Sequence, residues 1–262
     1  MDYARKILRI ILVLFGLAGL TISAALAQGS QLQAVPTSLE KAVAGLGGVE
    51  TLQQLSGLAI GARGVRWIHD EGLTPGSTAG MIGPFEVQVN YDITGDALRL
   101  DYNLQSVGLE RQVSEVIAGE LGYIDGQDGN FGPPGIKNMS SDRWASIRKH
   151  QRLLNPHLIL RDILANPSLA TEGGEVLFDG SVHHLVVVDE VAPLTLYINA
   201  GTGRIAKLTT MENDALRRDV PLEIFYYSWQ SVGQEGFFFP AELYIAYDGD
   251  IVHKEDGLPL HY

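Results

Sequence analysis

Histidine is the residue with the widest chemical range in this chain, and its seven copies are not spaced for metal binding or catalysis. The spacings that bring two imidazoles to one metal ion, H-x-H, H-x₃-H and H-E-x-x-H, are all missing. His183 and His184 are adjacent in a predicted strand, so their side chains point to opposite faces and cannot share a metal ion. There is no cysteine, which excludes zinc ribbons, disulfide scaffolds and thiol catalysis. We therefore expect no metal site, no cofactor and no catalytic residue in this chain.

Two other patterns also fall short of an active site. Ser-x-x-Lys occurs at 38–41 and 146–149, but the partner motifs S-D-N and K-T-G are absent. The segment 125–130 (D-G-Q-D-G-N) resembles a calcium loop, yet Gln and Gly occupy two ligand positions and no Glu closes it. We interpret it as a hairpin loop. A hydrolase that uses carboxylates such as Asp125 and Asp128 is a further hypothesis, which no spacing favours.

The composition is that of a globular, acidic protein. Of the 262 residues, 45% are hydrophobic and 19% are charged, which excludes a disordered chain. The net charge of −12 and the pI near 4.9 argue against binding to the phosphates of nucleic acids. The length suits one large domain or two small ones.

The first 27 residues have the three parts of a secretory signal peptide. The basic start, the apolar run and the A-L-A cleavage pattern lie at 5–9, 10–20 and 25–27. A membrane-spanning helix needs about 20 apolar residues, so the short run disfavours an uncleaved anchor. We predict cleavage after Ala27, export to the periplasm or the cell exterior, a short linker over 28–36, and no stable membrane anchor after cleavage.

Apolar residues repeat at helical spacing near the start and in the middle of the remaining chain. The first helical segment spans 38–55 and is broken in the middle at Gly45, Gly47 and Gly48. The second lies between a cap signal at 140–142 (S-S-D) and the N-P at 166–167, and within it Asn155, followed by Pro, ends one helix and starts the next. Helices are therefore predicted in two blocks.

Between and after these helices the period changes to two. Segments 85–91 and 98–104 alternate apolar and polar residues around a T-G-D turn, which predicts an antiparallel hairpin with one apolar face. Further strands are predicted at 109–117, 120–124, 175–178, 182–188, 194–199, 204–211, 222–229 and 237–247. Segment 72–84, rich in Gly and Pro, is predicted to be a flexible loop, either a lid or a passive connection. Strands grouped around one helical block predict the α+β class: a single domain over 37–262, in which a curved antiparallel sheet, or half-barrel, wraps around central helices.

Aromatic residues gather late in the chain, over 225–247. Alternation turns half of them inward, either as a packed core or as the lining of a cavity for an apolar ligand. We predict that any ligand, such as a lipid, lies between the sheet and the helices. The residues expected to contact it are Trp144, His157, Tyr226 and Trp229.

Several short motifs, taken in order, resemble the N-terminal region of exported bacterial hydrolases that carry a metallo-β-lactamase-fold domain further on. The matching segments are G-L-G-G-V-E-T-L-Q-Q-L at 45–55, P-H at 156–157, Y-I-N at 197–199, and the closing strands at 226–229 and 236–243, with Trp229 in place of the usual Tyr. The positions that the resemblance marks as structural are Gly47, Gly48, Asn199, Gly236 and Pro240. The region is also similar in pattern to the half-barrel of periplasmic lipoprotein carriers, where a sheet wraps a helix.

The resemblance implies an accessory role rather than chemistry. The zinc motif H-x-H-x-D-H of these hydrolases would lie in the later domain, and it is absent here. Segment 258–262 (L-P-L-H-Y) looks like the start of a further strand, which suggests a truncated chain. The main hypothesis is a non-catalytic half-barrel that is accessory to a covalently linked hydrolase domain. The alternative is a stand-alone periplasmic carrier of a lipid or another apolar ligand.

Overall fold

The structure, a computed structural model, describes residues 36–68, 80–106, 108–129, 132–214, 218–233 and 236–261, without the side chains of residues 214, 260 and 261. The chain divides into the units Met1–Ala34 and Val35–Tyr262, and every element described below belongs to the second unit. The predicted signal peptide and nearly all of the linker lie outside the described residues.

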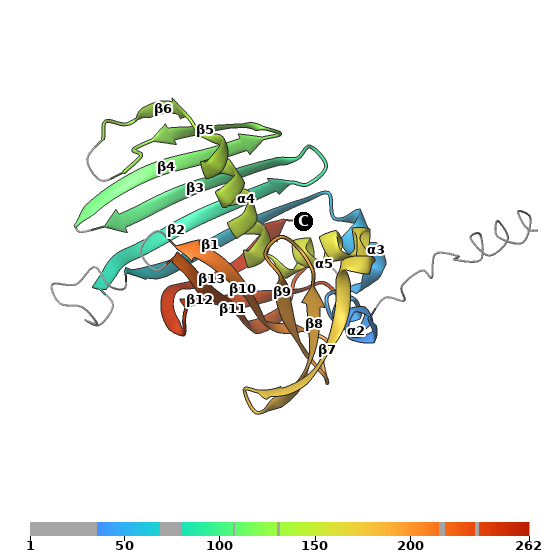
Figure 1. The fold of residues 1–262 in the computed structure, drawn as a ribbon. Coiled ribbons are helices and arrows are strands. Elements are labelled where there is room, and N and C mark those ends of the chain that lie inside the picture. The colour runs from blue at the N-terminus through green and yellow to red at the C-terminus, as the bar shows by residue number, and fades with distance from the viewer. Residues whose placement is uncertain are drawn as a thin grey trace, which may run out of the picture. The chain divides into compact units, whose positions relative to one another are not determined.

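Within the described residues, thirteen strands form one continuous antiparallel sheet (Figure 1). The strands are β1 (Gly57–Ile68), β2 (Gly80–Asp92), β3 (Ala97–Ser106), β4 (Leu109–Ala118), β5 (Leu121–Gly126), β6 (Gly135–Asn138), β7 (Ala170–Phe178), β8 (Ser181–Val188), β9 (Leu194–Asn199), β10 (Ile205–Asp214), β11 (Arg218–Ser231), β12 (Phe238–Tyr247) and β13 (Asp250–His261). Their order is β6-β5-β4-β3-β2-β1-β13-β12-β11-β10-β9-β8-β7. The sheet is thus two meanders, which the pairing of β13 with β1 joins.

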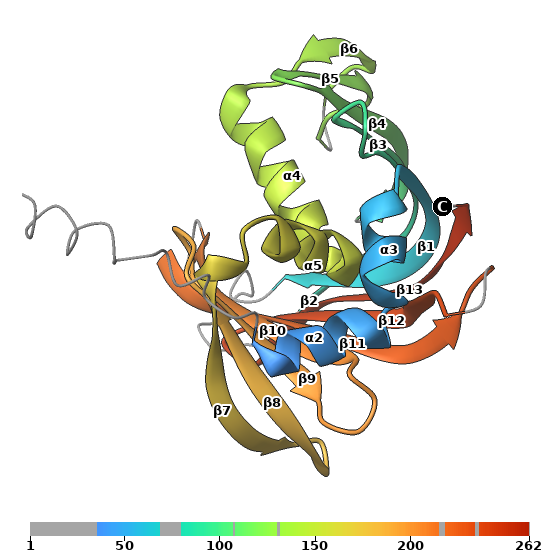
Figure 2. The same cartoon turned by 90° about the vertical axis from the view of Figure 1, so that its right-hand side faces the viewer.

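The helices lie on the concave side of this sheet. They are α2 (Thr37–Gly45), α3 (Gly48–Gln54), α4 (Ser141–Leu154), α5 (Pro156–Ala165) and the short 3₁₀ turn η1 (Pro167–Leu169). Figure 2 shows α4 and α5 between the two halves of the curved sheet. The predicted α+β fold, a curved antiparallel sheet around central helices, is confirmed.

Alternation along the strands produces the concave apolar face. In β2, Phe85, Val87 and Val89 are buried, whereas Glu86 and Gln88 are exposed. Paired residues of neighbouring antiparallel strands share a face, so the partners of these residues on β1 and β3 also point inward. Full burial of each such apolar side chain stabilises the fold by about 1.5–3 kcal/mol.

The buried residues form two core groups. The first joins α2 and α5 to β8–β12, and it includes Leu39, Leu46, Ile159, Leu160, Leu196, Ile224 and Leu243. The second joins β1–β5 to the start of β12, and it includes Leu58, Phe85, Val87, Leu100, Ile117, Phe237 and Phe239. Helix α4 packs its half-buried Trp144 and Ile147 against the second group.

The helix ends follow local signals in the sequence. Gly47 has a left-handed φ of 114°, which separates α2 from α3. At the start of α4, Ser140 Oγ accepts a hydrogen bond from the amide of Arg143 at 3.4 Å. At the start of α5, Asn155 Oδ1 accepts one from the amide of His157 at 3.0 Å. The predicted helix break and both predicted caps are therefore confirmed.

Two predicted boundaries are wrong, and two strands were not predicted. The predicted loop 72–84 is too long, because residues 80–84 belong to β2; residues 72–79 lie outside the described part. Residues 258–261 do not begin a further strand, because they end the 12-residue β13, which pairs with β1. No bounds are predicted for β1, although a strand is expected before the loop, and β6 and β13 are not predicted; the inward positions of these strands include glycine and polar residues.

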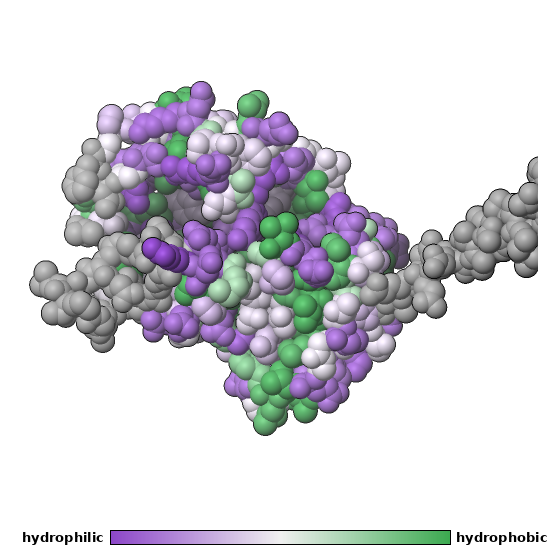
Figure 3. Space-filling model, viewed as in Figure 1, coloured by the Kyte–Doolittle hydropathy of each residue, from purple (hydrophilic) through white to green (hydrophobic). Residues whose placement is uncertain are grey.

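Apolar side chains reach the surface at the tip of the β7–β8 hairpin, at the bottom of Figure 3. Leu177 and Val182 of this hairpin are 73% and 46% exposed. Strand β7 is an edge of the sheet, so no further strand covers the tip among the described residues.

Candidate ligand-binding cavity

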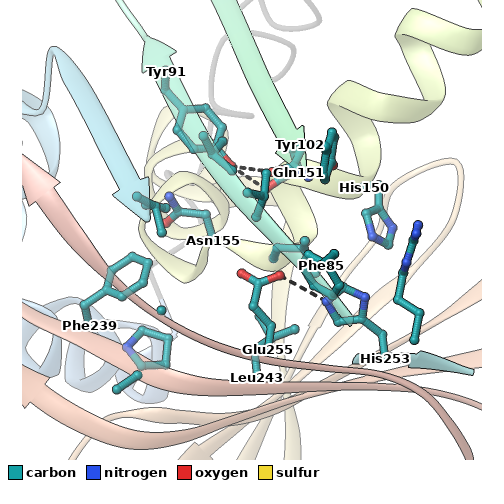
Figure 4. A pocket seen from close by; sticks show the side chains of 18 residues that line it. Phe85, Tyr91, Tyr102, His150, Gln151, Asn155, Phe239, Leu243, His253 and Glu255 are labelled. Carbon is teal, nitrogen blue, oxygen red and sulfur yellow. Dashed lines mark hydrogen bonds and ion pairs between the residues drawn. The ribbon is translucent and has the colours of Figure 1, made fainter. Parts of the chain in front are cut away.

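A cavity of about 150 Å³ lies between the concave face of the sheet and the end of α4. Strands β1, β2, β3, β12 and β13 and the α4–α5 junction supply its wall (Figure 4). The apolar part of the wall includes Ile60, Phe85, Val87, Val89, Leu154, Phe239 and Leu243. These side chains come from both core groups, so the cavity lies where the two groups meet.

Two tyrosines bring hydroxyl groups into this wall from the inward faces of β2 and β3. The Tyr91 hydroxyl lies 3.1 Å from both the backbone oxygen and Oε1 of Gln151, and it can donate to either. This contact ties β2 to the last turn of α4. Burial raises the pKa of Tyr91 and of Tyr102, and the carboxylate of Glu255 adds to both shifts. Both hydroxyls therefore stay protonated and can act as donors.

A contact between a histidine and a glutamate on the inward face of β13 forms another part of the wall. His253 Nε2 lies 3.0 Å from Glu255 Oε2, and the two side chains are only 14% and 16% exposed. Figure 4 shows this pair beside Phe85, whose ring centroid is 4.9 Å from that of His253. The carboxylate of Glu255 thus has its partner on its own strand.

His150 of α4 faces the same cavity as a neutral imidazole. Burial lowers its pKa to about 4, and the nearby His253 adds to the decrease, while Glu255 opposes it. At neutral pH the ring therefore carries no charge and can both donate and accept a hydrogen bond.

Arg66 of β1 is the cationic side chain that lines the cavity within the described residues. Its guanidinium carbon lies 5.6 Å from the centroid of the Phe85 ring, within the range of a cation–π contact. Burial lowers the pKa of Arg66; the charge of Arg111 adds to this effect and Tyr102 opposes it.

Helix α4 is fixed to the sheet mainly by ion pairs. The pairs are Arg143–Glu115 at 2.6 Å, Arg143–Asp128 at 3.0 Å and Lys149–Glu212 at 2.8 Å, together with Arg148–Asp96. Of the side chains of α4, Gln151 and Leu153 are buried. A second hollow of about 300 Å³ borders α4 and shares Tyr102, His150 and Gln151 with the cavity.

The four residues predicted to contact a ligand do not line this cavity. His157 is 0% exposed, and its ring stacks on those of Phe237 and Phe239 with centroid distances of 4.5 and 5.6 Å. Neither of its ring nitrogens meets a partner at full hydrogen-bonding geometry, although the backbone of Phe238 lies close enough to oppose the shift in part, and burial lowers its pKa to about 3.

The other three predicted residues lie in or against the core. Tyr226 is 2% exposed, and its hydroxyl donates to the backbone oxygen of Leu153. Trp144 and Trp229 are half-buried against the second and the first core group. A role in ligand binding stays a prediction for all four residues.

The positions marked by the family motifs mostly form turns. Gly47 and Gly236 have positive φ values of 114° and 91°, and Gly48 has 91°. Asn199 Oδ1 accepts hydrogen bonds from the amides of Gly201 and Thr202 at 3.0 Å, which closes the β9–β10 turn. Pro240 is the one of the five that lines the cavity.

Sequence reasoning missed the polar residues of the cavity. Tyr91 and Tyr102 occupy inward positions of the predicted hairpin. They are the residues with a hydroxyl group among otherwise apolar inward residues, and this could have marked them as part of a site. Arg66, His253 and Glu255 lie on strands whose bounds the sequence analysis did not predict, so no pattern placed them together.

Neither a metal cluster nor a membrane-spanning helix is found in the described part of the chain. No group of three or more His, Asp and Glu side chains there could hold a metal ion. None of the helices described is long and apolar enough to cross a membrane.

Comparison with known proteins gives distant structural likenesses. No protein-family model matches the sequence, and no curated protein matches it. A LolA superfamily protein from Nitrosomonas europaea is similar at 10% identity, with a TM-score of 0.48, over 86% of this chain and 92% of that one. A putative outer membrane lipoprotein-sorting protein domain from Vibrio parahaemolyticus is similar at 8% identity, with a TM-score of 0.47, over 87% and 92%. A DUF1329 family protein from Desulfovibrio piger is similar at 10% identity, with a TM-score of 0.42, over 86% and 91%.

Proposed function

We propose that this protein is an exported binding protein without catalytic activity, which holds a lipid or another apolar ligand between its sheet and α4. The cavity carries this proposal. Its wall combines apolar side chains with a few converging polar groups, the combination typical of small-molecule sites.

The size of the cavity limits what fits without rearrangement. An engineered apolar cavity of about 150 Å³ holds a benzene-sized ligand, whereas most small-molecule sites measure about 300–1,000 Å³. A ring or a short acyl segment therefore fits the cavity of about 150 Å³ directly. A longer chain requires an element of the wall to move.

Helix α4 is the element best suited to move. Its ion pairs are partly exposed, and such pairs contribute about 0–1 kcal/mol each. Two of its side chains are buried, whereas five residues of the shorter α5 are buried. Displacing α4 therefore exposes less apolar surface than displacing α5 would. Each ligand methylene that is buried in place of α4 stabilises the complex by about 0.8 kcal/mol.

The accessory role beside a covalently linked hydrolase domain stays a prediction, which no described residue tests. Sequencing of the gene beyond the codon for Tyr262 would test it directly. The binding proposal does not depend on that outcome.

Titration with a neutral, environment-sensitive dye tests the proposal, with decanol as the competitor. We expect saturable dye binding that decanol reverses. Val87→Phe adds a ring to the cavity wall and should weaken dye binding at least tenfold. Gln88→Phe is the matched control, because Gln88 is the next residue of β2 and is exposed on the opposite face. An absence of saturable binding, or equal weakening by both variants, would refute the proposal.

A further inference from the structure

Arg66 lines the cavity, and Arg111 lies beside it on β4 without lining the cavity; neither has an acidic partner among the described residues. Arg143, Arg148 and Arg152 each form an ion pair with a carboxylate. Arg66 and Arg111 form none within the described residues, and the Nε of each, like that of Arg148, is buried without a hydrogen-bond partner. Buried polar groups are nearly always hydrogen-bonded, so these two groups call for an explanation.

The two guanidinium groups lie on the same face and near each other. Arg111 on β4 is in register with Leu104 on β3, which is in register with Phe85 on β2. Arg66 on β1 extends over the ring of Phe85, at 5.6 Å from the centroid. Arg66 therefore reaches across β2 toward Arg111, and the two positive charges repel each other.

Neither arginine forms an ion pair with the acidic group nearest the cavity. The Glu255 carboxylate lines the cavity, but its contact within the described residues is with His253, at 3.0 Å. His150 is half-buried and, with its pKa lowered to about 4, neutral at pH 7. The Tyr102 hydroxyl lines the same cavity and remains a donor. Arg66 and the Tyr102 hydroxyl therefore line the cavity with Arg111 beside them, in a chain whose net charge is −12.

We infer that Arg66 and Arg111, with the Tyr102 hydroxyl, bind the phosphate or carboxylate of an amphiphilic ligand whose apolar part occupies the cavity. This inference rests on the proposed function and adds the class of ligand. The guanidinium fork matches the geometry of both anions, and a bound anion would satisfy the free Nε groups and cancel the repulsion. In a strongly acidic protein, a local positive site is also what an anion needs in order to approach.

Competition against the neutral dye separates the anionic from the apolar contribution. Decyl phosphate should displace the dye at a concentration at least tenfold lower than decanol. Arg66→Gln and Arg111→Gln should each abolish this preference while leaving displacement by decanol unchanged. Arg63→Gln is the matched control, because Arg63 is exposed on the other face of β1, and it should keep the preference. Inorganic phosphate should not raise the Tm at concentrations where decyl phosphate does.

The possible outcomes separate the inference from the proposed function. If decanol and decyl phosphate bind equally well, the inference is wrong and the proposed function stands. If neither binds, both are wrong. An Arg66-dependent rise in Tm with inorganic phosphate alone would show a site for free phosphate and overturn the assignment of an amphiphile. Without ligand, Arg66→Gln should not lower the Tm, because the substitution removes an unpaired charge. If Arg66→Gln lowers the Tm by the same amount with and without decyl phosphate, Arg66 has a structural role and the inference is overturned.

Discussion

The buried imidazole of His157 predicts that this protein loses stability in mild acid. The ring is 0% exposed, and neither of its nitrogens meets a partner at full hydrogen-bonding geometry. Burial lowers its pKa from 6.5 to about 3, and the backbone of Phe238 offsets this only in part. Because the folded pKa is depressed, the penalty is absent above the unfolded pKa near 6.5 and grows as the pH falls toward 3.

The expected loss follows from proton linkage. At pH 5 the unfolded imidazole is almost fully protonated and the folded one is not, so His157 lowers the free energy of unfolding by about 2 kcal/mol relative to pH 8. His150, whose pKa is about 4, should contribute a similar loss of about 2 kcal/mol over the same range. The parent protein should therefore lose about 4 kcal/mol between pH 8 and pH 5 from these two residues.

Urea denaturation of His157→Phe at pH 8 and pH 5 measures this contribution. A phenyl ring can stack between Phe237 and Phe239 and does not titrate, so the loss between the two pH values should shrink by about 2 kcal/mol. Ile159→Val is the control: it removes a buried methyl group two residues along α5 and should cost about 1 kcal/mol at both pH values. If His157→Phe loses as much stability as the parent, then His157 is not a neutral buried ring and the reasoning is wrong.

Three further predictions concern packing and backbone. Trp144→Ala should lower the free energy of unfolding, measured by urea denaturation, by about 2 kcal/mol. This is less than the roughly 3–5 kcal/mol expected for a fully buried ring, because Trp144 is half-buried. A decrease of more than about 4 kcal/mol would contradict this. Tyr226→Phe should cost about 1–2 kcal/mol, because it leaves the backbone oxygen of Leu153 without its donor; an unchanged Tm would show that this bond contributes nothing. Gly45→Ala should lower the free energy of unfolding more than Gly48→Ala does, because a Cβ on Gly45 would lie 2.7 Å from the backbone of the β9–β10 turn. A Cβ on Gly48 would meet open space, so Gly48→Ala should lower it by only about 1–2 kcal/mol, through the left-handed φ. The reverse order would show that the close approach at Gly45 is absent.

The sequence predicts those parts of the fold in which local pattern and final environment agree. Segments 85–91 and 98–104 alternate strictly, and their inward residues are buried apart from Tyr91 and Tyr102, which are half-buried. Ser140 and Asn155 cap helices because their side chains reach amides two or three residues along the chain, whatever the rest of the fold does.

The cavity could not be predicted in the same way. Strand β13 has His253 and Glu255 at inward positions, and β1 has Gly64 and Arg66 there, so neither strand shows an apolar period of two. Local pattern fails in both strands because their inward residues line a cavity instead of filling a core. The prediction that a ligand would contact Trp144 and Tyr226 followed the aromatic residues, which the fold uses mainly for packing.

The junction of β1 and β13 explains why a cavity forms at this place. A Cβ on Gly64 would lie 2.1 Å from the backbone oxygen of Lys254 and 2.8 Å from the ring of Phe85, so glycine is what allows that ring to lie against the junction. A Cβ on Gly257 would similarly lie 2.6 Å from the Cβ of Ala62. The residues at the junction are small or polar and do not fill the space between the two core groups. A cavity therefore separates the groups at this place. A ligand in this cavity would contact side chains of both groups at once, and its binding energy would add to the stability of both halves of the sheet. The Tm should therefore rise with the ligand concentration relative to Kd, and at any one concentration the rise should be smaller in Val87→Phe.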